Sequence, residues 1–260
     1  MGLEIFRAFA TRFGLVRALI LRDLLARHGR QSLGFFWDIM DPIVLATGVM
    51  IIWSVVESGF HQVSITTLAV ACYLPLTLSR HLIGPLTRLL RNNSNLLFHR
   101  QITAIEVITA RIISEFLSST SALILIYFVT VNVGVVDPIE NWPLALLGWL
   151  FTGWFYGGMA LLACAWTEIW DPAEKFIPPI QYLLMPLSAA FFMVDWVPSH
   201  AQRLLLLNPA VHCYEIFRAG FFGDGIPAHY SLPYLTAWSI GLTLAGMAAI
   251  YRVRDRIQIS

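Results

Sequence analysis

The stretch that decides the fold is RLLLLNPAVHCYEIFR, residues 203–218, which lies in the segment 196–230 between two long apolar segments. A polar surface loop is the usual connection at such a place, yet this one consists of two short apolar runs separated by Asn208 and Pro209. Each run is about half of the roughly 20 residues that a membrane-spanning helix needs. Proline removes a hydrogen-bond donor and asparagine tolerates turn geometry, so we expect the chain to reverse there. The stretch therefore predicts a re-entrant helical hairpin, whose backbone must be shielded by protein or line a water-filled cavity.

The composition is that of an integral membrane protein. Of the 260 residues, 57% are hydrophobic and 13% are charged, whereas soluble domains carry about 25% charged residues. The three cysteines lie in apolar surroundings, which predicts buried thiols rather than a disulfide framework. No short apolar segment with a small-residue cleavage site opens the sequence, so we expect no cleaved signal peptide.

Six apolar segments long enough to cross a bilayer follow residues 1–38. They predict an all-α membrane protein with a single domain over residues 1–260, because no internal repeat is present. The predicted spans are 41–60, 65–84, 105–135, 144–167, 176–195 and 231–251. The segment 196–230 carries the hairpin on the periplasmic side, and residues 252–260 form a tail.

Residues 4–28 predict an amphipathic helix that lies at the membrane interface. Its apolar residues fall in one stripe about 80° wide, and they are Phe6, Phe9, Phe13, Val16, Ile20 and Leu24. Arg17 falls inside that stripe, so either a break near Gly14 or a snorkelling side chain must accommodate it. The alternative that this helix packs on a soluble partner stays open.

The distribution of Lys and Arg orients the spans. With the N-terminus inside, 15 of the 17 basic residues fall on the inner side, counting those at span edges as inside. Only Arg203 and Arg218, both in the segment 196–230, fall on the outer side. We therefore expect both termini in the cytoplasm and a hairpin that enters from the outer face.

Motifs for several catalytic classes are missing from the sequence. It contains no G-x-x-x-x-G-K-[ST] nucleotide loop, no G-x-S-x-G nucleophile elbow and no H-E-x-x-H helix. Acids at span midpoints are also too few for a proton-coupled transporter. His212 and Glu215 are two ligands at most, which is too few for a metal site. With Arg218 they instead predict a polar stripe that braces the hairpin through hydrogen bonds, although a membrane-embedded enzyme that uses His212 and Glu215 remains an alternative of a different class.

Aromatic residues gather along the predicted span 144–167. Those near its ends fit an interfacial belt, whereas Trp154, Tyr156 and Trp166 lie deeper. Aromatic faces inside a conduit suit sugar rings, because the C–H surfaces of sugars are apolar. These three residues are candidate substrate contacts, and packing within the bundle is the alternative role for each of them.

Several motifs resemble one known family. Leu21-Arg-Asp-Leu24, followed by Leu33-Gly-Phe-Phe-Trp-Asp-Ile-Met-Asp-Pro42, resembles the first segment of ABC-2 type polysaccharide export permeases. Leu207-Asn-Pro-Ala-Val-His-x-x-Glu-x-x-Arg218 resembles their signature before the last span, and the tail Tyr251-Arg-x-Arg-Asp255 also fits. Within that family, the sequence looks most like the inner-membrane permease of group 2 capsular polysaccharide ABC transporters.

The resemblance implies a multi-pass permease that exports lipid-linked acidic capsular polysaccharide across the bacterial inner membrane. It implies a homodimer with two separate ATPase subunits, which bind the ATP and Mg²⁺, so we expect no cofactor, no metal and no catalytic site in this chain. A periplasmic polysaccharide co-polymerase adaptor and an outer-membrane polysaccharide exporter are the further partners, and nucleic acid is not one. ABC-2 permeases for O-antigen, teichoic acid or a small molecule are the alternatives.

Three groups of residues take roles under this interpretation. A basic entrance for the anionic cargo is expected from Arg27, His28, Arg30, Arg88, Arg91 and Arg100, unless these residues only follow the positive-inside rule and bind lipid headgroups. The segment that docks the ATPase is expected at 92–101, with Asn92, Asn93, Asn95, Phe98 and Gln101. The hairpin has Asn208 and Pro209 as its apex or hinge, and His212, Glu215 and Arg218 as its brace.

Overall fold

The computed structural model describes residues 2–29, 64–93 and 102–257, together with Met40, Val44 and Gly48. Throughout these ranges the chain forms helices and turns and no β-strand, which confirms the all-α prediction. The predicted first span, 41–60, lies outside the described residues apart from Val44 and Gly48.

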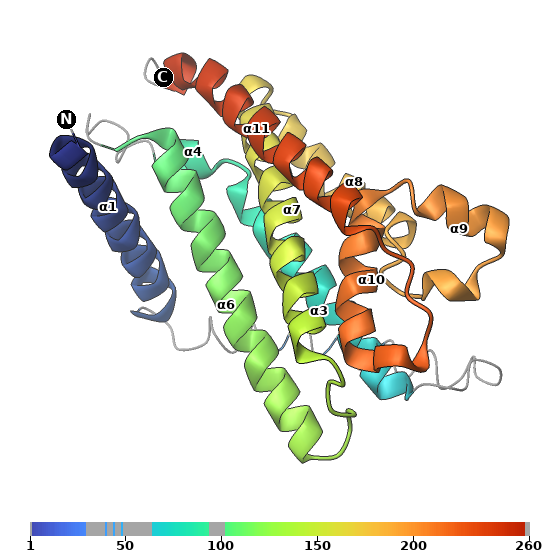
Figure 1. Cartoon of the computed structure of the whole chain (residues 1–260). Coiled ribbons are helices and arrows are strands. Elements are labelled where there is room, and N and C mark those ends of the chain that lie inside the picture. Colours follow the sequence, from blue (N-terminus) through green and yellow to red (C-terminus); the bar gives the residue numbers. More distant parts are fainter. Residues whose placement is uncertain are drawn as a thin grey trace.

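Three long helices form the frame of the bundle, namely α6 (Ala104–Asn132), α7 (Trp142–Ile169) and α11 (Leu232–Ile257). In Figure 1, α6 and α7 run antiparallel and α11 packs along α7. Each is long and apolar enough to cross a membrane, α11 over Leu232–Val253, and no other helix within the described ranges is. The predicted spans 105–135, 144–167 and 231–251 therefore correspond to helices of membrane-crossing length and composition.

Capping residues set where two of these helices begin. Before α6, the Thr103 hydroxyl accepts from the Glu106 amide at 3.4 Å, and the Thr103 amide donates to Glu106 Oε2 at 2.8 Å. This reciprocal capping box satisfies two amides that a helix start otherwise leaves unpaired. Before α7, Asn141 Oδ1 accepts from the Leu144 amide at 3.1 Å, which is the usual N-cap contact.

The second predicted span, 65–84, is α3 (Ile65–Ile83), a helix that includes Pro75. Residues 67–79 are all buried, in contact with α6, α7 and α10. The chain then forms two short helices, η1 (Gly84–Leu86) and α4 (Leu89–Asn92).

The fifth predicted span, 176–195, is wrong at its C-terminal end. The helix α8 (Ala173–Leu187) has 15 residues, about 22 Å at 1.5 Å per residue, whereas the hydrocarbon core of a bilayer is roughly 30 Å thick. The chain turns at Ala189, whose φ of 53° is in the left-handed region, and continues into η2 (Val194–Trp196). Carbonyls at this helix end bind side chains from elsewhere: Leu187 O accepts from Asn208 Nδ2 at 3.0 Å, and Ala189 O accepts from Arg218 Nη1 at 2.9 Å.

Asn208 separates two helices, as the Asn-Pro pair predicted, and the two helices differ in burial. The first, α9 (Ser199–Leu205), has no buried residue and projects from the side of the bundle (Figure 1). The second, α10 (Pro209–Phe222), has residues 210–221 all buried and leads into η3 (Gly223–Gly225). Its backbone lies so close to α7 that a Cβ added to Gly148 would sit 2.5 Å from the Phe217 nitrogen. The second apolar run is therefore buried in the bundle, whereas the first packs against it through the partly buried Leu205 and Leu206.

The N-terminal helix, α1 (Gly2–Gly29), is continuous through Gly14 and packs on α6. Of the two alternatives for Arg17, the break near Gly14 is absent, and the residue itself is exposed. Of the predicted apolar stripe, Phe13 is 68% exposed, whereas Leu19, outside that stripe, is buried. The residues that pack toward the core are Leu15, Val16, Leu19 and Ile20.

Ion pairs at both ends of this contact fix which face of α1 meets α6. Arg12 Nη1 lies 2.9 Å from Glu106 Oε1. Asp23 Oδ1 lies 2.8 Å from Arg111, which also contacts Glu115 at 2.9 Å. Because residues 12 and 23 share one face of a helix, the two pairs hold that face of α1 against α6.

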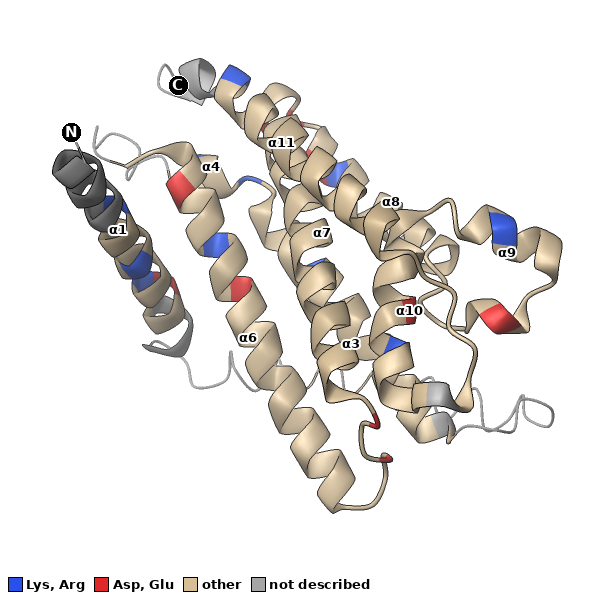
Figure 2. Ribbon diagram, viewed as in Figure 1, with Lys and Arg blue, Asp and Glu red and all other residues tan. Residues whose placement is uncertain are grey.

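Both chain ends lie at one end of the molecule, together with α4 (Figure 1). Figure 2 shows basic residues of α1, α4 and α11 toward this end, whereas the loop between α6 and α7 at the opposite end carries Asp137 and Glu140. The three cysteines are buried and unpaired, as predicted, and they are Cys72, Cys164 and Cys213. The charge asymmetry of the sequence is thus also an asymmetry of the folded molecule.

Candidate functional site

Arg218 and Glu215 of α10 form an ion pair in the interior of the protein. They are 1% and 2% exposed, and Arg218 Nη2 lies 2.7 Å from Glu215 Oε1. Arg218 Nη1 donates to the carbonyls of Ala189 at 2.9 Å and Phe192 at 2.6 Å. A buried charge is tolerated only when it is paired and hydrogen-bonded, and here both conditions are met.

The carboxylate of Glu215 and the imidazole of His212 also bind backbone groups. Glu215 accepts from the amides of Val194 at 3.3 Å and His229 at 3.0 Å. His212 Nδ1 accepts from the Ser231 amide at 3.0 Å, and Nε2 lies 3.0 Å from the Leu206 carbonyl. Since a neutral imidazole has one donor and one acceptor nitrogen, these contacts select the tautomer with hydrogen on Nε2. Three side chains thereby tie α10 to the segments before and after it.

No group of three or more His, Cys, Asp and Glu side chains in the described part of the chain could hold a metal ion. The His212–Glu215 pair is engaged by backbone groups at both ring nitrogens and both carboxylate oxygens. The hydrogen bonds of His212 and Glu215 therefore serve to hold α10 against neighbouring segments of the bundle.

Arg88 and Arg91 form a second cluster of ion pairs, with acids at the junction of α7 and α8. Arg88 has φ 60° immediately before α4, and its guanidinium contacts Glu174. Arg91 contacts Asp171 directly and lies 3.4 Å from Glu168 Oε2. The hydrogen bond from Arg91, and then its charge, lower the pKa of Asp171, and the same hydrogen bond raises the pKa of Arg91. Arg88 and Arg91, two of the predicted entrance arginines, are therefore paired with carboxylates of the chain itself.

The structure places the predicted entrance and docking residues only in part. Arg88, Arg91, Asn92 and Asn93 lie together in or beside α4, where Asn93 Oδ1 accepts from Arg22 of α1 at 3.3 Å. The backbone of Arg27 and His28 belongs to the last turn of α1, and their side chains lie outside the described part of the chain. The others lie outside the described residues altogether: Arg30, Asn95, Phe98, Arg100 and Gln101.

The three candidate aromatic contacts point in different directions. Trp154 is 42% exposed and its Nε1 donates to Thr243 of α11 at 3.2 Å. Trp166 is 39% exposed and stacks on Trp170, with ring centroids 6.1 Å apart. Tyr156 is buried, and its hydroxyl lies 3.4 Å from that of Tyr214. Residues two apart on a helix face away from each other, so Trp154 and Tyr156 do not form one binding surface.

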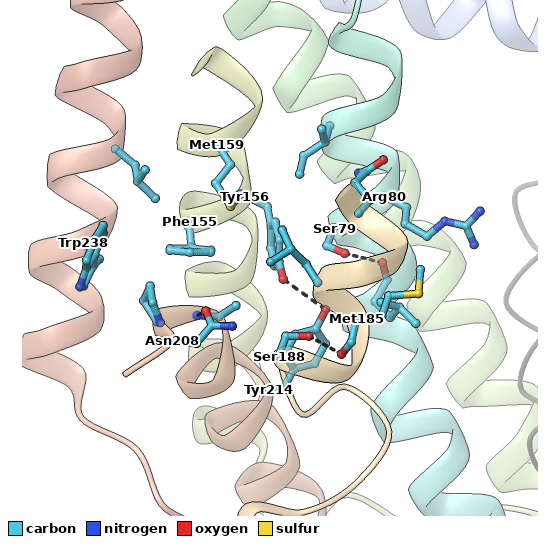
Figure 3. Close-up of a pocket in the computed structure, with 17 residues that line it drawn as sticks. Ser79, Arg80, Phe155, Tyr156, Met159, Met185, Ser188, Asn208, Tyr214 and Trp238 are labelled. Carbon is cyan, nitrogen blue, oxygen red and sulfur yellow. Dashed lines mark hydrogen bonds between the residues drawn. The ribbon is translucent and has the colours of Figure 1, made fainter. Parts of the chain in front are cut away.

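A cavity of about 230 Å³ lies beside the N-terminus of α10 (Figure 3). Its walls come from α3, α7, α8, α10 and α11, and include Ser79, Tyr156, Met185, Asn208 and Trp238. Among the predicted substrate contacts whose side chains the structure describes, Tyr156 alone lines this cavity, and Asn208, the predicted hinge, borders it.

The sequence interpretation did not single out four residues that matter here. Glu168, Asp171 and Glu174 supply the charges opposite Arg88 and Arg91, and their spacing of three residues directly after a predicted span was a usable signal. Arg80 lines the cavity from the last turn of α3. A cation in an otherwise apolar segment is a default functional candidate, so this residue was also detectable.

The sequence matches the profile of one protein family and is similar to several capsule export proteins. The profile of the family described as ABC-2 type transporter matches residues 14–222, from within α1 to the end of α10. Capsule polysaccharide export inner-membrane protein CtrC of Neisseria meningitidis serogroup A is 31% identical over 251 residues, which are 94% of this chain and 92% of that protein. Capsule polysaccharide export inner-membrane protein BexB of Haemophilus influenzae is 26% identical over 245 residues, 94% of this chain and 92% of BexB. Polysialic acid transport protein KpsM of Escherichia coli is 25% identical over 252 residues, 94% of this chain and 95% of KpsM.

Proposed function

This chain belongs to the ABC-2 type transporter family, and we propose that it is the membrane permease subunit of an ATP-driven exporter of lipid-linked acidic capsular polysaccharide. The observation that carries this proposal is the similarity, over 94% of the chain, to proteins named for capsule polysaccharide export at the inner membrane. The region of similarity therefore spans both α10 and α4 and is not confined to one motif.

In this proposal the membrane domain has six spans. Residues 41–60 form the first, α3 and α8 the second and fifth, and the three long helices the others. Because α8 is only about 22 Å long, the turn that follows it would lie within the bilayer. The buried α10 occupies a different level of the bundle from α8 (Figure 1), which supports a re-entrant segment hinged at Asn208 and Pro209. The N-terminal helix α1 would lie along the inner interface beside α6.

We place the end of the molecule that carries both termini and α4 in the cytoplasm, because Lys and Arg favour that side. The sequence has no nucleotide-binding loop, so ATP and Mg²⁺ would bind two separate ATPase subunits that dock at residues 92–101. The chain would act as a homodimer, with a periplasmic adaptor and an outer-membrane exporter completing the pathway.

The ion pairs at α4 determine how the basic entrance would bind its cargo. Acidic groups of the cargo would have to compete with Glu168, Asp171 and Glu174 for Arg88 and Arg91. The side chains of Arg88, Arg91 and Asp171 are 54%, 39% and 73% exposed, and exposed ion pairs exchange partners at little cost. Trp154 and Trp166, with exposed rings, are the proposed sugar contacts along the outer side of α7.

The test is deletion of the gene, with complementation by the wild-type chain. We expect surface capsule to disappear, polysaccharide to accumulate inside the cell, and both changes to be reversed only when an active ATPase partner is present. Lipid and sugar analysis of the accumulated material identifies the cargo. Accumulation of O-antigen, teichoic acid or a small molecule would replace the capsule proposal by another ABC-2 function. Turnover of a substrate by the purified chain, without any ATPase, would instead support the membrane-embedded enzyme.

A further inference from the structure

The cavity beside α10 is a largely apolar chamber whose hydroxyl groups already bind the protein. The hydroxyls of Tyr156 and Tyr214 lie 3.4 Å apart and face each other, as the dashed line in Figure 3 shows. Ser79 donates to the Leu76 carbonyl at 2.7 Å, and Ser188 to the Met185 carbonyl at 2.9 Å. A sugar in this chamber would leave most of its hydroxyls without partners, and each buried unpaired hydroxyl is costly.

The rest of the wall suits a flexible hydrocarbon chain. Its side chains are mainly aliphatic, aromatic and thioether groups, among them Phe155, Met159, Leu184, Met185 and Leu242. Methionine side chains adapt to ligands of irregular shape. Burial of methylene groups in such a chamber is favourable in proportion to the apolar area removed from water.

The charged residue at the rim is Arg80. Figure 3 shows its guanidinium extending away from the chamber, while the residue itself lines the wall. The guanidinium lies over the ring of Tyr182, 5.5 Å from the centroid, and Nη2 lies 3.4 Å from the Tyr182 hydroxyl. Five other arginines contact a carboxylate, and they are Arg12, Arg88, Arg91, Arg111 and Arg218. Within the described ranges no carboxylate lies at ion-pair distance from Arg80, so its charge is available to an anion.

We propose that this cavity binds one acyl chain of an anionic phospholipid of the inner leaflet, with the lipid phosphate at Arg80. Arg80 lies 15 residues after the start of α3, about 22 Å along the helix axis, toward the end where basic residues gather (Figure 2). A headgroup at Arg80 and a chain that reaches Tyr156 and Asn208 therefore match the two ends of one lipid. This lipid is a resident of the protein rather than its cargo, and the proposal does not depend on what is exported.

The experiment uses the full-length chain in vesicles that contain a photoreactive phosphatidylglycerol, with a diazirine near the end of one acyl chain. After irradiation, mass spectrometry locates the labelled peptides. We expect labelling of residues 155–159 in α7 and 181–188 in α8. Phosphatidylcholine with the same diazirine chain should label about fivefold less, because it lacks the net negative charge that Arg80 attracts.

Two pairs of variants separate the chamber from the rim. Leu184→Trp fills the chamber and should abolish labelling, whereas Leu183→Trp, next to it on α8 but 68% exposed, should leave labelling unchanged. Arg80→Gln should make the two photoreactive lipids label equally, whereas Arg203→Gln on the exposed helix α9 should preserve the preference. Size-exclusion profiles confirm that each variant is folded.

Three results would overturn the proposal. Absence of label in the wild-type peptides would show that the chamber holds no lipid chain. Equal labelling of the wild type by both lipids would remove Arg80 as a phosphate site. Competition by the extracted lipid-linked polysaccharide, but not by unlabelled phosphatidylglycerol, would make the chamber a cargo site instead.

Discussion

Two of the arginine–carboxylate clusters in this protein have different surroundings. In α10, Arg218 and Glu215 are 1% and 2% exposed, and backbone groups of three other segments complete the set of contacts. Beside α4, the Arg91 side chain is 39% exposed and is shared between Glu168, which is 6% exposed, and Asp171, which is 73% exposed. An ion pair is obligatory where water is absent, whereas water can replace the exposed contact of Arg91 with Asp171. The first place is thereby suited to hold the hairpin, and the second to bind a partner or cargo that arrives.

Removal of the buried arginine should have the largest effect. Arg218→Ala leaves Glu215 as an uncompensated buried charge and frees the turn after α8, which should lower the free energy of unfolding by about 3–5 kcal/mol. The yield of monodisperse protein on size-exclusion chromatography should fall accordingly. Arg203→Ala, on the exposed helix α9, is the matched control and should stay within about 0.5 kcal/mol of wild type.

A second variant shows whether charge or packing is responsible. Arg218→Met combined with Glu215→Leu removes both charges and should recover part of the lost yield, because apolar replacements of buried ion pairs are often tolerated. A well-folded Arg218→Ala protein with an altered cargo would show that Arg218 selects cargo rather than bracing the hairpin.

The packing of α10 on α7 should be the next most sensitive feature. Gly148→Val places a side chain where the backbone of Phe217 now lies, and overpacking of this kind costs about 1–3 kcal/mol. The midpoint of thermal unfolding should fall. Gly241→Val in α11, where a Cβ meets nothing within 4 Å, is the control for the change in helix propensity. An equal loss in both variants would mean that the close approach of α10 and α7 contributes little.

The turn held by Arg218 offers a prediction of opposite sign. Ala189 has φ 53° and is fully buried, and an L-residue in this region is strained by about 1–2 kcal/mol. Ala189→Gly should therefore raise the midpoint of thermal unfolding, because released strain exceeds the added entropy of the unfolded chain. Ala190→Gly, at an equally buried position without a positive φ, should lower it. Destabilisation by both changes would show that the turn stores no strain.

The exposed cluster should give the smallest change in stability and a clear change in function. Arg91→Ala should alter the free energy of unfolding by less than about 1 kcal/mol. Combined with Arg100→Ala, it should reduce capsule export while co-purification of the ATPase partner stays normal. Arg252→Ala, an exposed arginine of α11, should leave export unchanged. Normal export by the double variant would leave the basic entrance without support.

Local patterns predicted most helices but not the contacts between them. Apolar length placed α3, α6, α7 and α11 within a few residues of their observed ends, and the pair Asn208-Pro209 placed the break between α9 and α10. These features depend on residues close in sequence, such as a cap or a proline, and such signals can be read directly.

The errors arose where distant residues decide the structure. α8 ends early at a turn bound by Arg218, 29 residues away, and the face of α1 is set by Glu106 and Arg111, which lie 94 and 88 residues away. The partners of Arg88 and Arg91 come from the α7–α8 junction, 77–86 residues along the chain for the closest contacts. Spacing within a helix carries no information about such pairs, so the candidate site could be named from the sequence while its charge balance could not.

The burial of all three thiols has a practical consequence for mapping the membrane topology. Cys72, Cys164 and Cys213 are 2%, 0% and 0% exposed, and maleimide reagents react with accessible thiolates. We therefore expect the native cysteines not to react with maleimides, so that reporter cysteines can be introduced without first removing the native ones. Val133→Cys, in the turn after α6, and Lys175→Cys, at the start of α8, would then be labelled by an impermeant maleimide from opposite sides of the membrane.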